Sequence, residues 1–216
     1  MHHRHIIVLL MLICGMLAPD VFTQESRVTY MLEKGSKLWF TGTTTIGDYA
    51  CAAVRVDGTG TVRADACSRV VSSGGDTLTA GVSVTVGVRN LDCGNSTMND
   101  DMYAAMKADS SPTIVYRLLR SEIHADSADA DSVRTLDTVG ELTIAGVTQI
   151  VRIRATIHRL TLTRYHILGS KALSMHDFVV TPPSAVWGLI KADDRLVVHF
   201  DFVAVETTGR LRITEK

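Results

Sequence analysis

The sequence predicts an all-β fold: one antiparallel barrel or sandwich of about eight strands, with one short helix. Apolar and polar residues alternate along several stretches, which is typical of strands with one buried and one wet face. Glycine-containing turn signals separate these stretches, and only one segment has a helical pattern. Many short strands joined by tight turns indicate a closed or two-layered antiparallel sheet.

Three stretches carry the alternation most clearly. Valines occupy every second position from Val82 to Val88, and apolar residues do the same from Val151 to Ile157 and from Leu196 to Ala204. Further strands are expected at Lys37–Thr45, Cys51–Val56, Gly58–Ala64, Thr113–Ser121, Gly140–Ile144 and Leu160–Leu168. Turns are expected at Asp57-Gly58, at Ser73–Asp76 and at Ala145-Gly146.

The one predicted helix covers Asp100–Lys107. Asn99 or Asp100 can cap its free amides, and acidic residues suit its positive end. The Ser110-Ser111-Pro112 run is expected to stop it before the next strand.

Composition points to a single globular domain without an affinity for polyanions. The 216 residues are 46% hydrophobic, which is enough for one sizeable core. Lysine and arginine total 22 and aspartate and glutamate total 23, so the net charge is close to zero. A nucleic-acid partner is therefore not expected.

The first residues have the three regions of a secretory signal peptide. A basic start precedes an apolar run from Ile6 to Leu17, and a polar stretch follows. We expect cleavage after Thr23, or alternatively after Ala18, which places the mature protein in the periplasm or outside the cell. An uncleaved anchor and a lipoprotein modified at Cys14 are the alternatives; the first is disfavoured because the run is shorter than the ~20 residues of a spanning helix.

In an exported protein the cysteines can form disulfides, because disulfides persist in oxidising compartments. Cys51, Cys67 and Cys93 remain after cleavage. Their odd number and the absence of a Cys-x-x-Cys pair argue against a zinc cluster and favour one bridge plus one free thiol.

Motifs for catalysis or metal binding are missing from the sequence. There is no Gly-x-Ser-x-Gly elbow, no His-Glu-x-x-His and no phosphate loop. The acidic stretch 125–132 lacks the glycine and the glutamate of an EF-hand, so we interpret it as a solvated hairpin tip. We therefore expect no metal, no cofactor and no enzymatic turnover, although an unrecognised hydrolase remains an alternative.

Four segments, taken in order, resemble the YceI-like family. They are Leu91–Lys107 followed by Ser111–Tyr116, the Gly-x-Leu-Thr-x-x-Gly-Val-Thr pattern from Gly140 to Val151, the Asp177-Phe178 motif, and the alternating last strand. The resemblance covers roughly residues 28 to 206. It implies a lipocalin-like antiparallel barrel, exported from the cytoplasm, that encloses a polyisoprenoid chain. The expected organisation is a signal peptide at 1–23, the barrel domain at 27–206 and a tail at 207–216.

The sequence also departs from the family pattern. Many relatives carry Arg-Asp before the helix and an arginine before Asp-Phe, where this chain has Asn99-Asp100 and Ser174-Met175-His176. Any head-group contact made by those arginines is absent here. The chain is similar to the branch with a cysteine in an early strand and Cys-Gly after a middle strand. We predict a disulfide between Cys51 and Cys93, with Cys67 free.

The leading functional prediction is that the barrel binds an apolar lipid, a polyisoprenoid or quinone-like chain, with little dependence on salt. Its alternative is a structural or interaction module whose barrel is filled by side chains, because valine and isoleucine can line a tunnel or fill it. The low aromatic content of 6% favours space inside. The residues predicted to line the ligand site are Val84, Val86, Leu142, Ile144, Val151, Ile153, Leu196, Val198, Phe200 and Phe202.

Overall fold

The computed structural model describes residues 27–63, 76–78, 80–125, 133–185 and 189–207. The predicted signal peptide, Cys67, most of the 125–132 stretch and the tail beyond Thr207 lie outside these ranges. The expected domain limits at 27 and 206 fall close to the outer limits of the described chain.

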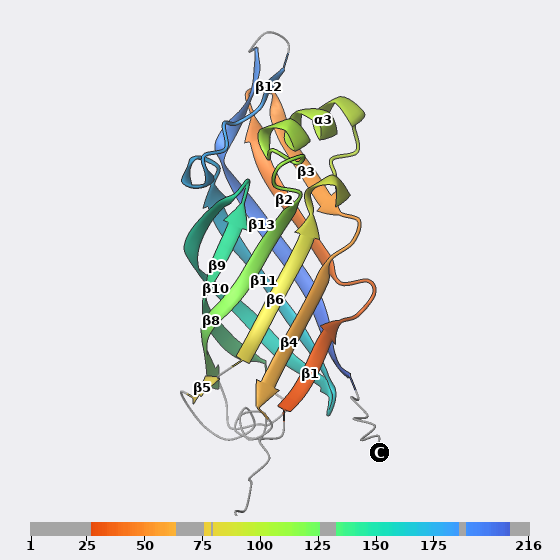
Figure 1. Cartoon of the computed structure of the whole chain (residues 1–216), viewed down its shortest axis with the longest axis vertical. Coiled ribbons are helices and arrows are strands. Elements are labelled where there is room, and N and C mark those ends of the chain that lie inside the picture. Colours follow the sequence, from red (N-terminus) through yellow and green to blue (C-terminus); the bar gives the residue numbers. More distant parts are fainter. Residues whose placement is uncertain (1–26, 64–75, 79, 126–132, 186–188, 208–216) are drawn as a thin grey trace, which may run out of the picture.

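Eight antiparallel strands form a closed barrel, as predicted (Figure 1). They follow one another around the barrel in chain order, and the first pairs with the last, with Leu32 opposite Ala204. Closure leaves no unpaired sheet edge at this level of the barrel. The eight strands are β1 (Arg27–Leu32), β4 (Asp57–Arg63), β6 (Ala80–Gly87), β8 (Thr113–Ala125), β9 (Arg134–Ile144), β10 (Val147–Thr161), β11 (Arg164–Ser174) and β13 (Ile190–Thr207).

Shorter strands extend the barrel toward one end. The long strand β13 pairs with β1 along one half and with β2 (Lys37–Thr44) along the other. β3 (Gly47–Ala53) pairs with β2, just as β4 pairs with β1. β7 (Leu91–Asp92) pairs with β3. Two further pieces are β5 (Asp76–Leu78), which pairs with β8, and β12 (Ser184–Ala185), which pairs with β13. β1 and β2 therefore lie along two halves of the same long strand, β13.

The β9–β10 hairpin shows how local sequence sets the register. Ala145 and Gly146 both have positive φ, +50° and +82°, which is the backbone of a two-residue hairpin turn. Ile144 therefore pairs with Val147, and the register continues to Arg134 opposite Ile157. The predicted turn at Ala145-Gly146 is confirmed. The turn predicted at Asp57-Gly58 is wrong, because these residues begin β4, and most of Ser73–Asp76 lies outside the described residues.

The helix α3 spans Ser96–Ala105, so the predicted range of 100–107 was shifted along the chain. Its cap is Asn95, whose side chain accepts a hydrogen bond from the Met98 amide at 3.1 Å. Asn99, predicted as a cap, instead accepts from the Cys93 amide and donates to Asp92. Several residues in this segment can cap a helix, and the one that does so is decided by how the chain leaves β7.

Two predicted strands extend beyond the observed ones, and two others are too short, since β8 continues to Ala125 and β9 already begins at Arg134. The Leu160–Leu168 segment is divided by a turn, because β10 ends at Thr161 and β11 begins at Arg164. The Cys51–Val56 strand ends at Ala53. In both places an alternating pattern continues through a bend, so periodicity alone does not reveal the break.

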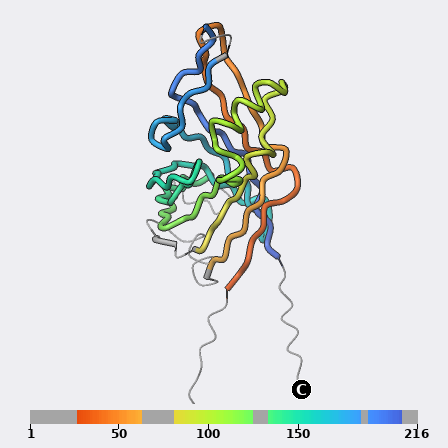
Figure 2. Tube along the Cα trace, turned by 45° about the horizontal axis from the view of Figure 1, so that its top comes forward, coloured from red at the N-terminus to blue at the C-terminus, as the bar shows by residue number. Residues whose placement is uncertain are grey.

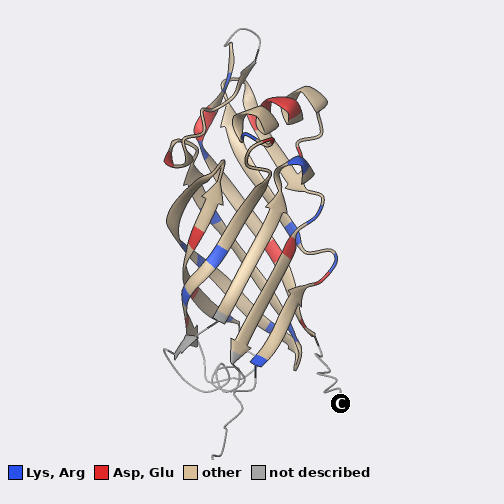
Figure 3. Cartoon of the chain, in the orientation of Figure 1, with Lys and Arg blue, Asp and Glu red and all other residues tan. Residues whose placement is uncertain are grey.

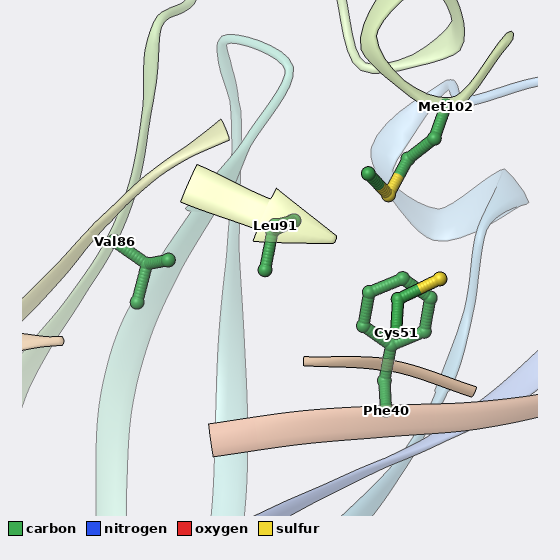
Figure 4. Close-up of a cluster of buried hydrophobic side chains, with 5 residues drawn as sticks. All are labelled: Phe40, Cys51, Val86, Leu91 and Met102. Carbon is green, nitrogen blue, oxygen red and sulfur yellow. The ribbon is translucent and has the colours of Figure 1, made fainter. Parts of the chain in front are cut away.

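The larger of two clusters of buried apolar side chains lies at the end of the barrel covered by α3, which we call the helix end (Figures 1 and 2). Its members come from β2, β3, β6, β7 and α3, and they converge between the helix and the barrel (Figure 4). They are Phe40, Cys51, Val86, Leu91 and Met102. Packing of Met102 against this cluster fixes the helix over the end of the barrel.

Candidate functional site

A cavity of about 940 Å³ occupies the interior of the barrel. Its volume lies near the upper limit of the 300–1,000 Å³ range typical of small-molecule sites. Inward-facing residues of the barrel strands line it, and most of these side chains are apolar. The barrel is therefore not filled by its own side chains.

Nine of the ten residues predicted to line the ligand site border this cavity. The exception is Val151, which is buried but does not reach the cavity. At this point β10 lies beside the short 3-10 helix η2 (His176–Phe178), to which Gln149 donates a hydrogen bond at the Asp177 carbonyl. The nine are Val84, Val86, Leu142, Ile144, Ile153, Leu196, Val198, Phe200 and Phe202.

The sequence prediction omitted further apolar residues of the wall. Leu136 and Ile157 continue the inward phase of the residues predicted on β9 and β10, and the others lie on β2, β8 and β11, where no lining residue was predicted. That phase was the available signal. Apolar wall residues of this kind are Leu38, Phe40, Ile114, Ile123, Leu136, Ile157 and Ile167.

Three inward-facing glycines let aromatic rings lie against the wall. Gly42 lies under Tyr49, Gly140 under Tyr116 and Gly169 under Phe200, each ring coming from a neighbouring strand. A Cβ atom on Gly140 would lie 2.5 Å from the Tyr116 ring, so no other residue fits without displacing it. The rings thus cover the wall instead of crossing the lumen.

Two tyrosine hydroxyls provide polar groups along the wall. Tyr116 donates to Thr138 at 3.1 Å, and Thr138 in turn donates to the Ile153 carbonyl. Burial raises the pKa of Tyr116, so its hydroxyl remains protonated. Burial, with the nearby charge of Asp193, also raises the pKa of Tyr49.

The two ends of the cavity are lined by different kinds of side chain. At the end opposite α3, Tyr30 and Tyr165 pack edge to face, with ring centroids 5.7 Å apart. At the helix end the wall is rich in sulfur, with Met98, Met102 and Met106 from the helix segment and the disulfide below them. Methionine adapts its shape to irregular apolar partners, which suits a cavity end.

The predicted disulfide is present. Cys51 of β3 and Cys93, which follows β7, are joined, with their Cα atoms 3.9 Å apart. Both cysteines also border the cavity. The bridge ties the start of the helix segment to the barrel wall.

Charged residues are interspersed along the strands of the barrel (Figure 3). On the outer face Arg154 donates to Asp137 at 2.7 Å, and this contact lowers the pKa of Asp137. Three charged residues border the cavity instead: Asp48, Asp101 and Lys171. In the part of the chain that the structure describes, no three histidine, cysteine or acidic side chains are grouped so as to hold a metal ion. Across the same ranges no helix is long and apolar enough to span a membrane.

Solved structures with the same fold come from bacteria. BcnA of Burkholderia cenocepacia superposes with a TM-score of 0.58 at 16% identity, covering 78% of this chain and 95% of its own. A Saccharophagus degradans domain, described as polyisoprenoid binding and implicated in plant cell wall breakdown, gives 0.58 at 14% identity, covering 82% and 98%. A search of curated proteins finds no match to this sequence.

The family comparison agrees with the architecture. The model of the YceI-like domain matches residues 23–204, which include every strand of the barrel except the end of β13. A closed barrel, one short helix and the four motifs occur together in this stretch. The chain belongs to the YceI-like domain family.

Proposed function

We propose that this protein binds a long apolar lipid, a polyisoprenoid or quinone-like chain, inside its barrel. The observation that carries the proposal is the apolar cavity of about 940 Å³ in a closed barrel. The related Saccharophagus degradans domain, described as polyisoprenoid binding, supports the same ligand class. A filled structural barrel, the alternative expectation, does not account for this cavity.

The shape of the wall favours a chain over a compact ligand. Inward residues extend from Tyr30 and Tyr165 at one end to Met102 at the other, so the apolar surface continues along the barrel. Each buried methylene contributes ~0.8 kcal/mol, and several isoprene units can therefore exceed the ordering cost of binding.

A series of isoprenols tests the proposal. Geraniol, farnesol and geranylgeraniol differ by one isoprene unit each, and affinity measured by titration calorimetry should increase by about tenfold or more per unit until the cavity is filled. Mass spectrometry of an organic extract of protein purified from its native envelope should identify the bound chain. Equal affinity across the series, together with an extract free of lipid, would contradict the proposal.

Two matched variants separate the inner face from the outer face of β10. Ile153→Gln places an amide on the cavity wall and should weaken farnesol binding, with some loss of stability from the unpaired amide. Arg152→Gln changes the adjacent, exposed position and should do neither. The proposal fails if both variants bind farnesol alike.

Export through a cleaved signal peptide at 1–23 is part of the proposal. The Cys51–Cys93 disulfide supports it, because such bridges persist in oxidising compartments. Intact-mass measurement on the periplasmic or secreted protein should show a chain that begins at Gln24. A chain retaining residues 1–23 would contradict cleavage.

A further inference from the structure

Lys171 is the only lysine or arginine among the described residues that border the cavity. It lies on β11 between Gly169 and Leu173, which share its inward phase, and opposite Val198 of β13. Its neighbours Ser170 and Ala172 are exposed on the outer face, whereas Lys171 is half-buried. The alternation therefore directs a cationic side chain into an apolar interior.

Within the described ranges the Lys171 ammonium has no hydrogen-bonding or ion-pairing partner. A charge beside apolar groups is costly unless it is paired, and its attraction for an opposite charge is stronger there than in water. Neighbouring strands place Val198 and Phe200 near it, not acidic groups. The wall thus presents a strong donor without an acceptor.

The hydroxyl of Tyr49 is a second donor without an acceptor in the described chain. The Tyr49 ring lies over Gly42 of β2, and Gly42 is opposite Leu196 of β13. Leu196 is in turn opposite Leu173 of β11, the next inward-facing residue after Lys171. Two strand spacings, roughly 10 Å, separate β2 from β11. The four-carbon stem of lysine and a head group a few ångströms wide can span that gap.

We infer that the helix-end half of the cavity binds an anionic head group, a phosphate or carboxylate carried by the lipid, with Lys171 Nζ and Tyr49 Oη as its donors. This inference rests on the proposed function. The tail extends from Lys171 toward Tyr30 and Tyr165 at the opposite end. This inferred charged contact differs from the expectation drawn from the sequence, in which binding depends little on salt and needs no charged group.

The two acidic residues of the cavity lie elsewhere on the wall. Asp48 is opposite Thr43 near the tip of the β2–β3 hairpin, where it is exposed, and Asp101 belongs to α3. Lys171 is deeper, at the level of Val198 and Phe40. A third carboxylate, Asp193, lies near enough to Tyr49 for its charge to act on the hydroxyl, but Asp193 is exposed and accepts a hydrogen bond from the exposed Thr43. Of the charged groups that border the cavity, Lys171 is the cationic one, and it favours an anion at its own level and not at the hairpin tip or the helix.

Three lipids with one tail test the inference: farnesyl monophosphate, farnesol and farnesylamine. The wild-type protein should bind the phosphate about tenfold more tightly than the alcohol, a difference of about 1.4 kcal/mol, and should bind the amine less tightly. Lys171→Met should abolish this preference, and Lys171→Arg should retain it. Tyr49→Phe should reduce it, and Lys37→Met, an exposed lysine on the outer face of β2, should leave it at the wild-type value.

The outcomes separate the two proposals. If none of the three lipids binds, the proposed function fails and the inference fails with it. If farnesol binds as tightly as farnesyl monophosphate, if the amine binds best, or if Lys171→Met keeps the preference, only the head-group assignment is overturned. Inorganic phosphate should bind far more weakly than farnesyl monophosphate, and equal affinity would overturn the assignment to a lipid.

Discussion

Gly42, Gly140 and Gly169 lie on the inward faces of their strands, each beneath an aromatic ring of a neighbouring strand. In a strand interior, glycine usually weakens pairing, and it often marks a close approach of another group. Here the approaching groups are Tyr49, Tyr116 and Phe200. The absence of Cβ atoms lets these rings lie flat, which preserves the lumen.

Gly169→Ala tests this role. The new methyl group would overlap the Phe200 ring, which must then rotate into the cavity. We expect a loss of about 1–3 kcal/mol in the free energy of unfolding, typical of overpacking, and weaker binding of the longer isoprenols. Urea denaturation and calorimetry measure the two effects.

Gly81→Ala on β6 is the control, because a Cβ there meets no atom within 4 Å. Its free energy of unfolding should remain within about 0.5 kcal/mol of the wild-type value. Similar losses in both variants would show that the glycines act through the backbone and not through the rings.

At the scale of elements, the break between β1 and β2 is bridged by a side chain. The hydroxyl of Ser36 accepts a hydrogen bond from the Val203 amide at 3.1 Å, and the Glu33 amide donates to the Val203 carbonyl at 2.8 Å. Val203 therefore keeps both backbone groups paired where the β-ladder is interrupted. This continuity lets one long strand, β13, support both β1 and β2.

Ser36→Ala should lower the free energy of unfolding by about 1–3 kcal/mol, because it leaves the part-buried Val203 amide unsatisfied. Amide hydrogen exchange at Val203 should accelerate as well. Ser170→Ala, at an exposed position of β11, provides the comparison and should be nearly neutral. Unchanged exchange at Val203 would show that Ser36 is not its partner.

At the scale of the whole molecule, the disulfide connects segments separated by 42 residues. Between them the chain passes through β4, β5 and β6 and returns to β3 through β7. A bridge over a loop of this length restricts the unfolded chain, and the chain-entropy account attributes about 4 kcal/mol to it.

Reduction of the protein, or the double change Cys51→Ala with Cys93→Ala, should therefore lower the free energy of unfolding by about 4 kcal/mol. Urea denaturation with and without reductant measures the difference. Peptide mapping of the oxidised protein should recover the Cys51–Cys93 pair and a free Cys67. Identical denaturation midpoints with and without reductant would contradict the expected stabilisation.

Local patterns in the sequence were sufficient to predict an antiparallel barrel or sandwich, the turn between β9 and β10 and nine residues of the cavity wall, and the resemblance to the YceI-like family selected the barrel. Period-two alternation assigns each residue to a face, and a face is a local property of the strand. The same reasoning did not locate the start of α3 at Asn95, because several neighbouring residues can cap a helix. It also missed the turn between β10 and β11, where alternation continues through the bend.

Whether the barrel is hollow was decided only in the tertiary structure. Valine and isoleucine line a tunnel or fill one equally well, and the outcome depends on rings from one strand lying over glycines of the next. Among the described residues, Lys171 lacks a partner because the strand beside it brings Val198 and Phe200 and no acidic side chain. Sequence alone determined which residues face inward, because that follows from strand geometry; what those residues meet follows from pairings between segments far apart in the chain.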